Sequence, residues 1–146
     1  MPRIGYYAIL RELQAVLQAE PTLNGVSVAI EGQGLVNDLA PWVNLRLDRR
    51  DAPPNEQYLA AGQRQRYFLR VLITCAQYAL DLGEASRLRD ELIGSVEVVL
   101  MGNRTVNGLI TTSWLEGGGF DLTALDAGFM ANGDILMVAD VSASTT

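Results

Sequence analysis

Histidine is absent from this chain, and its absence narrows the chemistry that the other side chains can carry out. Without an imidazole, neither a Ser-His-Asp nor a Cys-His arrangement can form, and the commonest metal ligand is missing. The single cysteine, Cys75, falls in an apolar, strand-like stretch, where a thiol usually behaves as a small buried hydrophobic group. We therefore expect Cys75 to be neither a nucleophile nor part of an internal disulfide.

Motifs that bind phosphate are missing as well. The sequence has neither a GxxxxGKS/T loop nor a GxGxxG that opens a helix. The glycine triplet at 117–119 is followed by Phe120 and Asp121, without a nearby lysine. A bend or bulge in a strand is the better interpretation of this triplet.

An acidic group in the middle of the chain offers a possible acid/base pair. Asp48, Asp51 and Glu56 lie close together in the sequence, but they interleave with Arg49 and Arg50. A solvated, mixed-charge loop explains this pattern more simply than general acid/base catalysis does. We therefore expect a protein that is not an enzyme, with no catalytic residue, no cofactor and no metal ion.

A stripe of basic and aromatic residues follows, with Arg64 and Arg66 beside Tyr67 and Phe68. Such a stripe can bind single-stranded nucleic acid, although charges at a strand edge also serve to prevent aggregation. The formal net charge of −6 disfavours general binding to phosphates.

The composition predicts one folded domain over residues 1–146, since 49% of the residues are hydrophobic and 19% are charged. We expect no membrane association, because no run approaches the roughly 18 apolar residues of a membrane-spanning helix. The first residues also lack the long apolar segment of a signal peptide.

The organising stretch is 66–101, which predicts a long strand that leads into an amphipathic helix. The odd positions from Tyr67 to Cys75 are apolar and the even positions are mixed, which indicates a sheet covered on one face. Asp81 and Glu84 have the spacing of a capping box at the start of the helix. Apolar residues then recur every three or four positions, so the helix should pack on the strand.

The other elements follow from periodicity and turn residues. We expect a helix at 6–19, strands near 26–30, 42–47, 109–116 and 135–141, and a turn at Asn132-Gly133. Residues 120–131 are ambiguous between a short strand with a turn and a bulged continuation. A long loop is expected at 48–65 and a flexible tail at 142–146. Together these elements predict an α+β fold, with a mostly antiparallel or mixed sheet and two helices packed on one face.

The second face of this sheet would be unusually apolar. It would carry Trp42, Arg46, Phe68, Arg70, Leu72, Thr74, Tyr78, Leu136 and Val138. Another layer of this chain or another chain must cover such a face. Because tryptophan and arginine dominate interface hot spots, the candidate subunit interface consists of Trp42, Arg46, Arg49, Arg50, Asp51 and Arg70. The alternative is that Trp42 is ordinary sheet packing and the arginines are solubilising charges.

The order of these elements resembles the tail terminator, or tail completion, proteins of long-tailed bacteriophages. The resemblance covers residues 4–142 approximately. It rests on the initial helix, the WVNL strand at 42–45, the DRR that opens a polar loop, the RxRYFLRVLI strand, the EASRLRDELI helix and the closing strand. Residues 120–131 do not match a strand of the family.

The resemblance implies a structural virion protein of the tail or neck, assembled in the host cytoplasm. Such proteins form a ring, typically six-fold, which caps the tail tube, ends its polymerisation and presents a surface for head–tail joining. The implied partners are other copies of the chain, the tail-tube protein and a head-side connector or stopper, with DNA only as cargo passing through the lumen. A stopper or adaptor, a tail-tube protein and a small enzyme without histidine stay open as alternatives.

Overall fold

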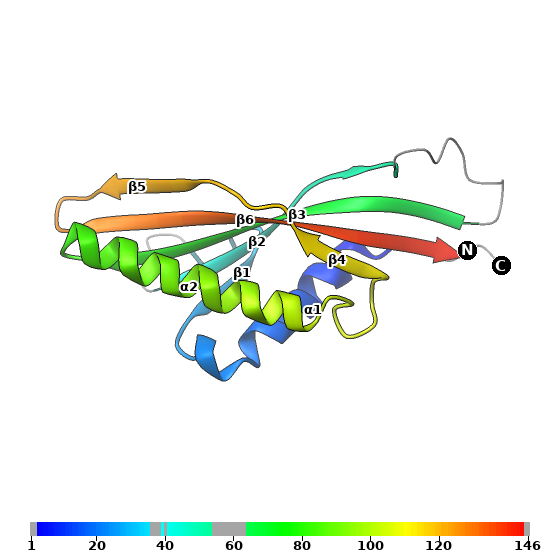
Figure 1. Ribbon diagram of the computed structural model, residues 1–146, viewed down its shortest axis with the longest axis horizontal. Helices are drawn as coiled ribbons and strands as arrows, with labels where there is room; N and C mark the ends of the chain where they lie inside the picture. Colours follow the sequence, from blue (N-terminus) through cyan, green and yellow to red (C-terminus); the bar gives the residue numbers. More distant parts are fainter. Residues whose placement is uncertain (1–2, 36–38, 40, 54–63, 145–146) are drawn as a thin grey trace.

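The protein is described by a computed structural model over residues 3–35, 39, 41–53 and 64–144 (Figure 1). Within these residues it has two α-helices and a six-stranded mixed sheet, which confirms the predicted α+β class. The elements in chain order are α1 (Tyr6–Gln18), the 3₁₀ turn η1 (Pro21–Leu23), β1 (Ser27–Ile30), β2 (Trp42–Asp51), β3 (Arg64–Ala79), α2 (Leu82–Gly102), β4 (Thr112–Leu115), β5 (Phe120–Ala124) and β6 (Phe129–Ser144).

Two long antiparallel strands form the centre of the sheet. β3 and β6 pair along all 16 residues of each, from Arg64 opposite Ser144 to Ala79 opposite Phe129. Strands of this length span about 50 Å. β2 and then β1 continue the sheet beyond β3, and β1 is parallel to β2. β4 and β5 share the other edge of β6, each pairing with a different half of it.

The sheet is strongly twisted, as long antiparallel ribbons are. In Figure 1, β2 and β3 lie above β6 at the end where β6 finishes, and below β6 at the other end. Because β3 and β6 are long, the protein is elongated. The β5–β6 turn and the start of α2 lie at one end, and the end of β2 and the start of β3 lie at the other.

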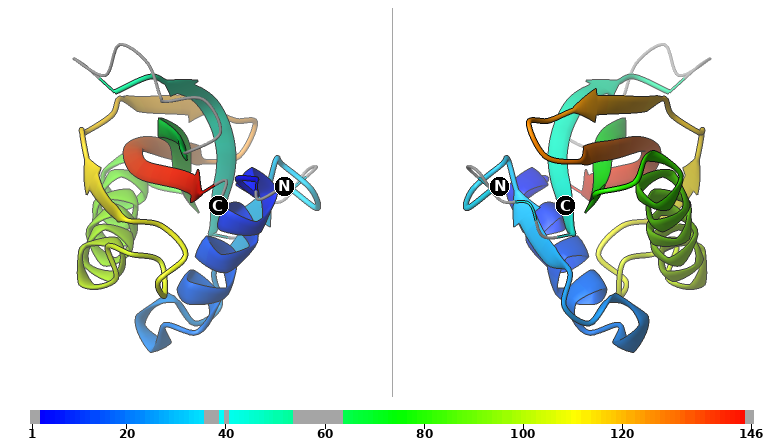
Figure 2. Two further views of the ribbon diagram at one scale, coloured as in Figure 1. Left: turned by 90° about the vertical axis from the view of Figure 1, so that its right-hand side faces the viewer. Right: turned by 90° about the vertical axis from the view of Figure 1, so that its left-hand side faces the viewer.

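Both helices pack on one face of the sheet (Figure 2). Their apolar stripes share one core with the inward positions of the strands. The buried helical residues are Ile9, Leu10, Leu13 and Leu17 of α1 and Ala85, Leu92, Val96 and Leu100 of α2. From the strands come Val43, Leu45, Leu69, Val71, Ile73, Cys75, Ile135, Met137 and Ala139. This face is the one that the odd positions of β3 predict.

The start of α2 confirms half of the predicted capping box. The Asp81 carboxylate accepts the backbone N–H of Glu84 at 3.0 Å, so it satisfies one of the free donors of the first turn. The Glu84 side chain does not return to Asp81. It pairs with Arg87 one turn later, because an oppositely charged side chain competes for it.

β2, β3 and β6 are longer than the sequence predicts, whereas β4 at Thr112–Leu115 is shorter than the strand predicted at 109–116. β2 continues to Asp51 and β3 begins at Arg64, so the predicted loop at 48–65 is too long at both ends, and residues 54–63 lie outside the described residues. The predicted tail is also wrong for residues 142–144, which belong to β6, while 145–146 are not described. Both errors have the same cause. Polar residues at a strand end predict a loop or tail, but the exposed end of a long strand can be polar and still form hydrogen bonds with its neighbour.

The turn predicted at Asn132-Gly133 is wrong, because both residues belong to β6 and pair with β3 on one side and β5 on the other. A Cβ at Gly133 would lie 2.2 Å from the Ile93 Cδ1 atom of α2, so glycine here provides room for the helix and not a turn. The turn lies instead between Ala124 and Phe129, and it makes β5 the short strand that was one of two options for 120–131.

Candidate functional site

The face of the sheet opposite the helices is not covered by either helix, and we call it the open face. Its positions alternate with the core positions of the same strands. Most of its apolar side chains are only half-buried. The residues are Trp42, Asn44, Arg46, Arg49 and Asp51 of β2, Arg66, Phe68, Arg70, Leu72, Thr74, Ala76 and Tyr78 of β3, Met130, Asn132, Asp134, Leu136, Val138 and Asp140 of β6, and Thr112, Trp114 and Glu116 at the edge.

Arg70 ties three parts of this face together. Its Nε donates to Asp51 Oδ2 of β2 at 2.9 Å, and its Nη1 donates to Glu116 Oε2, just after β4, at 2.6 Å. Arg49 adds a second ion pair to Asp51 at 3.2 Å. The hydrogen bonds to Glu116 and Asp51 raise the pKa of Arg70. The hydrogen bond between Arg70 and Glu116 also lowers the pKa of Glu116. The guanidinium therefore stays charged and fixed in orientation.

A further ion pair of the open face lies nearer the end of β6. Arg66 makes two hydrogen bonds of 3.0 Å to the carboxylate of Asp140, which is buried. The same guanidinium lies 5.6 Å from the centre of the Phe68 ring, and Phe68 meets Trp114 edge to face at 5.3 Å. Charged and aromatic side chains on this half of the open face are thus held by one another.

Toward the other end, polar contacts on the open face are fewer. The Thr74 hydroxyl donates to Asp134 Oδ1 at 2.8 Å. The side-chain oxygen of Asn132 is buried and has no hydrogen-bond partner among the described residues. Because most charges of the open face are already paired with one another, a protein surface suits it better than a phosphate backbone, which needs free cations.

Five of the six predicted interface residues lie together on the open face. They are Trp42, Arg46, Arg49, Asp51 and Arg70. Arg46 is exposed and has no ion pair within the described residues. Whether these residues contact another subunit stays a prediction.

Arg50, the sixth predicted interface residue, is not on this face. A bulge between Leu47 and Arg49 shifts the alternation, so Arg50 points to the helix side. There it donates to the Tyr6 hydroxyl at 2.6 Å and lies 4.6 Å from the centre of the Tyr67 ring. The bond to Tyr6 raises the pKa of Arg50. Arg50 therefore connects the start of α1 to the sheet.

Sequence reasoning missed Glu116, Trp114 and Asp140. A possible signal existed for Asp140, since a lone carboxylate inside an apolar strand usually has a partner. Glu116 gave no such signal, because its contact with Arg70 depends on how β4 lies along β6.

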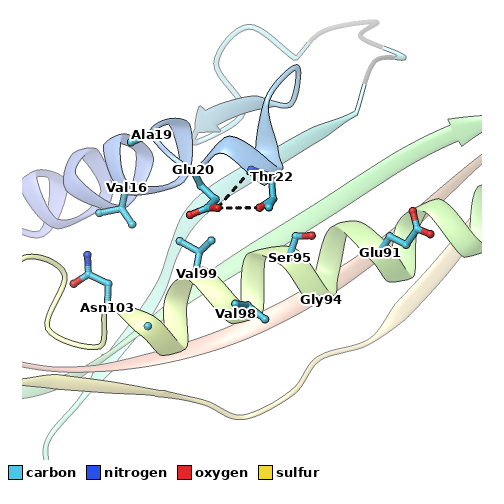
Figure 3. Close-up of a pocket in the computed structure, with 11 residues that line it drawn as sticks. Val16, Ala19, Glu20, Thr22, Glu91, Gly94, Ser95, Val98, Val99 and Asn103 are labelled. Carbon is cyan, nitrogen blue, oxygen red and sulfur yellow. Dashed lines mark hydrogen bonds between the residues drawn. The ribbon is translucent and has the colours of Figure 1, made fainter.

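A shallow groove of about 890 Å³ lies between α1, η1 and α2 (Figure 3). Its walls combine valines, small residues and two carboxylates, those of Glu20 and Glu91. The first accepts hydrogen bonds from the backbone N–H and hydroxyl of Thr22, and the second pairs with Arg87 at 2.6 Å. Both carboxylates are thus used within the fold, and the lining holds no cysteine or histidine for catalysis.

The remaining candidates also have structural explanations. Cys75 is completely buried, and this burial raises the pKa of its thiol to about 12. In the glycine triplet, a Cβ at Gly118 would lie 1.8 Å from the backbone oxygen of Asp134, so the triplet lets the chain pass close to β6 between β4 and β5. In the described parts of the chain, no group of three or more Cys, Asp or Glu side chains could hold a metal ion.

Compared with models of known protein families and with curated protein sequences, the chain matches none of them. Among the described residues, the structure has no helix with both the length and the apolar character to cross a membrane.

Proposed function

We propose that this protein is a structural virion component that closes into a ring, typically of six copies, at the end of a phage tail tube. There it would end polymerisation of the tube and offer a surface to the head-side connector. The observation that carries this proposal is the open face, a half-buried apolar surface that also presents tryptophan and arginine.

A ring requires that one patch of each copy meet a different patch of the next copy. The open face has the composition of such a patch, since aromatic residues and arginine are enriched at the centres of interfaces. Its ion pairs are formed before docking, so burying them under a neighbour leaves no charge without a partner.

The net charge of −6 supports the same role. DNA must pass through the lumen of such a ring without being retained. Each phosphate contact from an arginine would add affinity, and most arginines of the open face already bind carboxylates.

The test measures the assembly of the purified full-length protein by mass photometry and electron microscopy. A terminator gives closed rings of one mass, whereas a tail-tube protein gives filaments, and a persistent monomer contradicts the proposal. In the phage, removal of the protein should give overlong or headless tails. Normal tail length and normal head joining without it would rule the role out.

A single substitution tests whether the open face takes part in the contact between copies. Trp42→Ala should weaken ring formation about 30-fold or more, since a truncated hot spot costs about 2 kcal/mol or more. Tyr7→Ala is the matched control, because Tyr7 is an exposed aromatic residue on α1, away from the open face. Equal assembly of the two variants would show that Trp42 is ordinary sheet packing.

A further inference from the structure

The two ends of the long axis differ in character. One end is formed by the β5–β6 turn and the start of α2 (Figure 1). Four exposed leucines belong to the segments at this end. Their exposed fractions are 74% for Leu80, 44% for Leu82, 42% for Leu122 and 37% for Leu125. We call this end the leucine tip. Exposed leucines from three neighbouring segments gathered at one end indicate a contact surface.

The leucine tip is also acidic. Asp81, Asp121 and Asp126 lie at this end, and no basic residue occurs at 79–86 or 120–130. The nearest cation is Arg89 of α2, which lies 4.7 Å from the centre of the Phe120 ring. Asp121 and Asp126 are exposed and form no ion pair within the described residues. The tip therefore combines apolar side chains with negative charge, and it needs a partner surface that is apolar and positive.

Such a surface exists on the open face of the same chain, around Leu72 and Phe68. Two exposed arginines border it, with Arg46 directly opposite Leu72 and Arg49 opposite Arg70 in the register of β2 and β3. We call this part of the open face the arginine patch. It offers half-buried apolar side chains beside two cations: Arg46 has no ion pair within the described residues, and Arg49 already pairs with Asp51 at 3.2 Å, so a docked carboxylate would share it.

The leucine tip cannot reach the arginine patch of its own copy. The patch lies level with residues 70–72 of β3. Asp121 of the tip lies level with Ala76, through Asn132 of β6, and Leu80 follows Ala79, so the two surfaces are four to nine residues apart along β3. At about 3.3 Å per residue, this separation is roughly 13–30 Å along the strands, before the width of the strands between them is added. Charges so far apart are screened at physiological salt, where the screening length is about 8 Å. The two surfaces can therefore meet only between copies.

We infer that the leucine tip of one copy docks on the arginine patch of the next copy, so that leucines cover Leu72 and Phe68 and carboxylates face Arg46 and Arg49. This inference rests on the proposed ring and names its two contact surfaces. Because the surfaces differ and lie apart along one molecule, repeating the contact builds a head-to-tail assembly that can close.

Two charge-reversal variants test the pairing. In Asp121→Arg/Asp126→Arg the tip is reversed, and in Arg46→Glu/Arg49→Glu the patch is reversed. Each variant alone should stay monomeric under conditions where the wild type forms rings, since like charges then face each other. Arg3→Glu/Arg11→Glu is the matched control, because both arginines are exposed near or on α1, and it should form rings as the wild type does.

Mixing the two variants gives the decisive result. The reversed tip of one variant then matches the reversed patch of the other, and the two native surfaces match as well. An equimolar mixture should therefore restore closed rings in which the variants alternate, detected by native mass spectrometry. Restored assembly also proves that both variants fold.

An uncharged variant tests the apolar part of the contact. Leu80→Ser should weaken ring formation without a change in melting temperature, because this side chain is mostly exposed in the single copy.

Three outcomes overturn the inference. Rings from both reversed variants alone would show that the ring uses other surfaces, and the proposed function would stand. Two folded variants whose mixture stays monomeric would contradict this pairing in the same way. A wild type that forms no ring would overturn the proposed function, and the inference with it.

Discussion

The two faces of β3 have opposite relations to the rest of the chain. Leu69, Val71, Ile73 and Cys75 point to the helices and are almost completely buried, whereas Phe68, Arg70, Leu72 and Thr74 alternate with them and stay partly exposed. The residue types on the two faces overlap, since both contain leucine and other apolar side chains. What separates the faces is the cover that α1 and α2 provide on one of them.

The two faces of the strand therefore contribute differently to stability and to a possible interface. Burial on the covered face removes apolar surface from water, so that face supplies most of the stability of the fold. The open face contributes less to stability, because water still reaches it. Its ion pairs fix side-chain positions across β2, β3 and β4, which suits a surface that meets a partner.

The largest expected difference between the faces is in thiol reactivity. Burial raises the pKa of Cys75 from 9.0 to about 12, with smaller effects from the charges of Asp134 and Glu97. This higher pKa lowers the fraction of thiolate at pH 8 about a thousandfold. The thiolate is the reactive form of cysteine. Cys75 should therefore not react with Ellman's reagent in the folded protein, whereas a Cys75→Ala/Leu72→Cys variant should react readily. Rapid reaction of Cys75 would contradict the buried face, and equal rates in denaturant provide the control.

Stability comes next in size. Leu92→Ala removes a buried side chain of α2 from the core and should lower the free energy of unfolding by about 2–5 kcal/mol, measured by urea denaturation. Leu72→Ala makes the same change on the open face and should cost clearly less, since its side chain is only half-buried. A loss under about half a kcal/mol for Leu92→Ala would show that α2 packs through another face.

The smallest effect concerns pH. The hydrogen bonds from Arg70 and Trp114 lower the pKa of Glu116 below its ordinary value of 4.5. A lowered pKa in the folded state stabilises the fold above pH 4.5, and this contribution is lost as the pH falls through the folded value. The melting temperature of Glu116→Gln should therefore decline less steeply on acidification than that of the wild type. The Glu84–Arg87 pair, which lowers the pKa of Glu84, is present in both proteins and does not affect the comparison. Parallel curves would show that the Arg70–Glu116 bond adds nothing to stability.

Local patterns predicted much of the fold. The spacing of apolar residues every three or four positions predicted α1 and α2, and Asp81 predicted the start of α2. The alternation of apolar and polar residues in β3 predicted which face is covered. Strand ends were predicted less well, because polar residues at 48–51 and 142–144 read as loop or tail and yet pair with β3.

Much of the candidate site was predictable for the same reason. Once a strand and its covered face are known, alternation assigns Trp42, Arg46 and Arg70 to the other face. Alternation fails wherever a bulge intervenes, and the bulge between Leu47 and Arg49 puts Arg50 on the helix side, away from the other five candidate residues. A bulge depends on how two strands pair, and no local pattern here announced it.

The sequence by itself determined the elements, the chemistry that the chain lacks and the apolar excess of the second face, since these follow from residue types and their spacing. Only the tertiary structure decided which residues meet across long separations, such as Arg70 with Asp51 and Glu116, and Arg66 with Asp140. It alone brought leucines from three segments to one end and arginines of β2 beside apolar side chains of β3. The physical reason is that such contacts depend on strand order, register and twist, which are set by the packing of the whole chain and not by any short stretch of it.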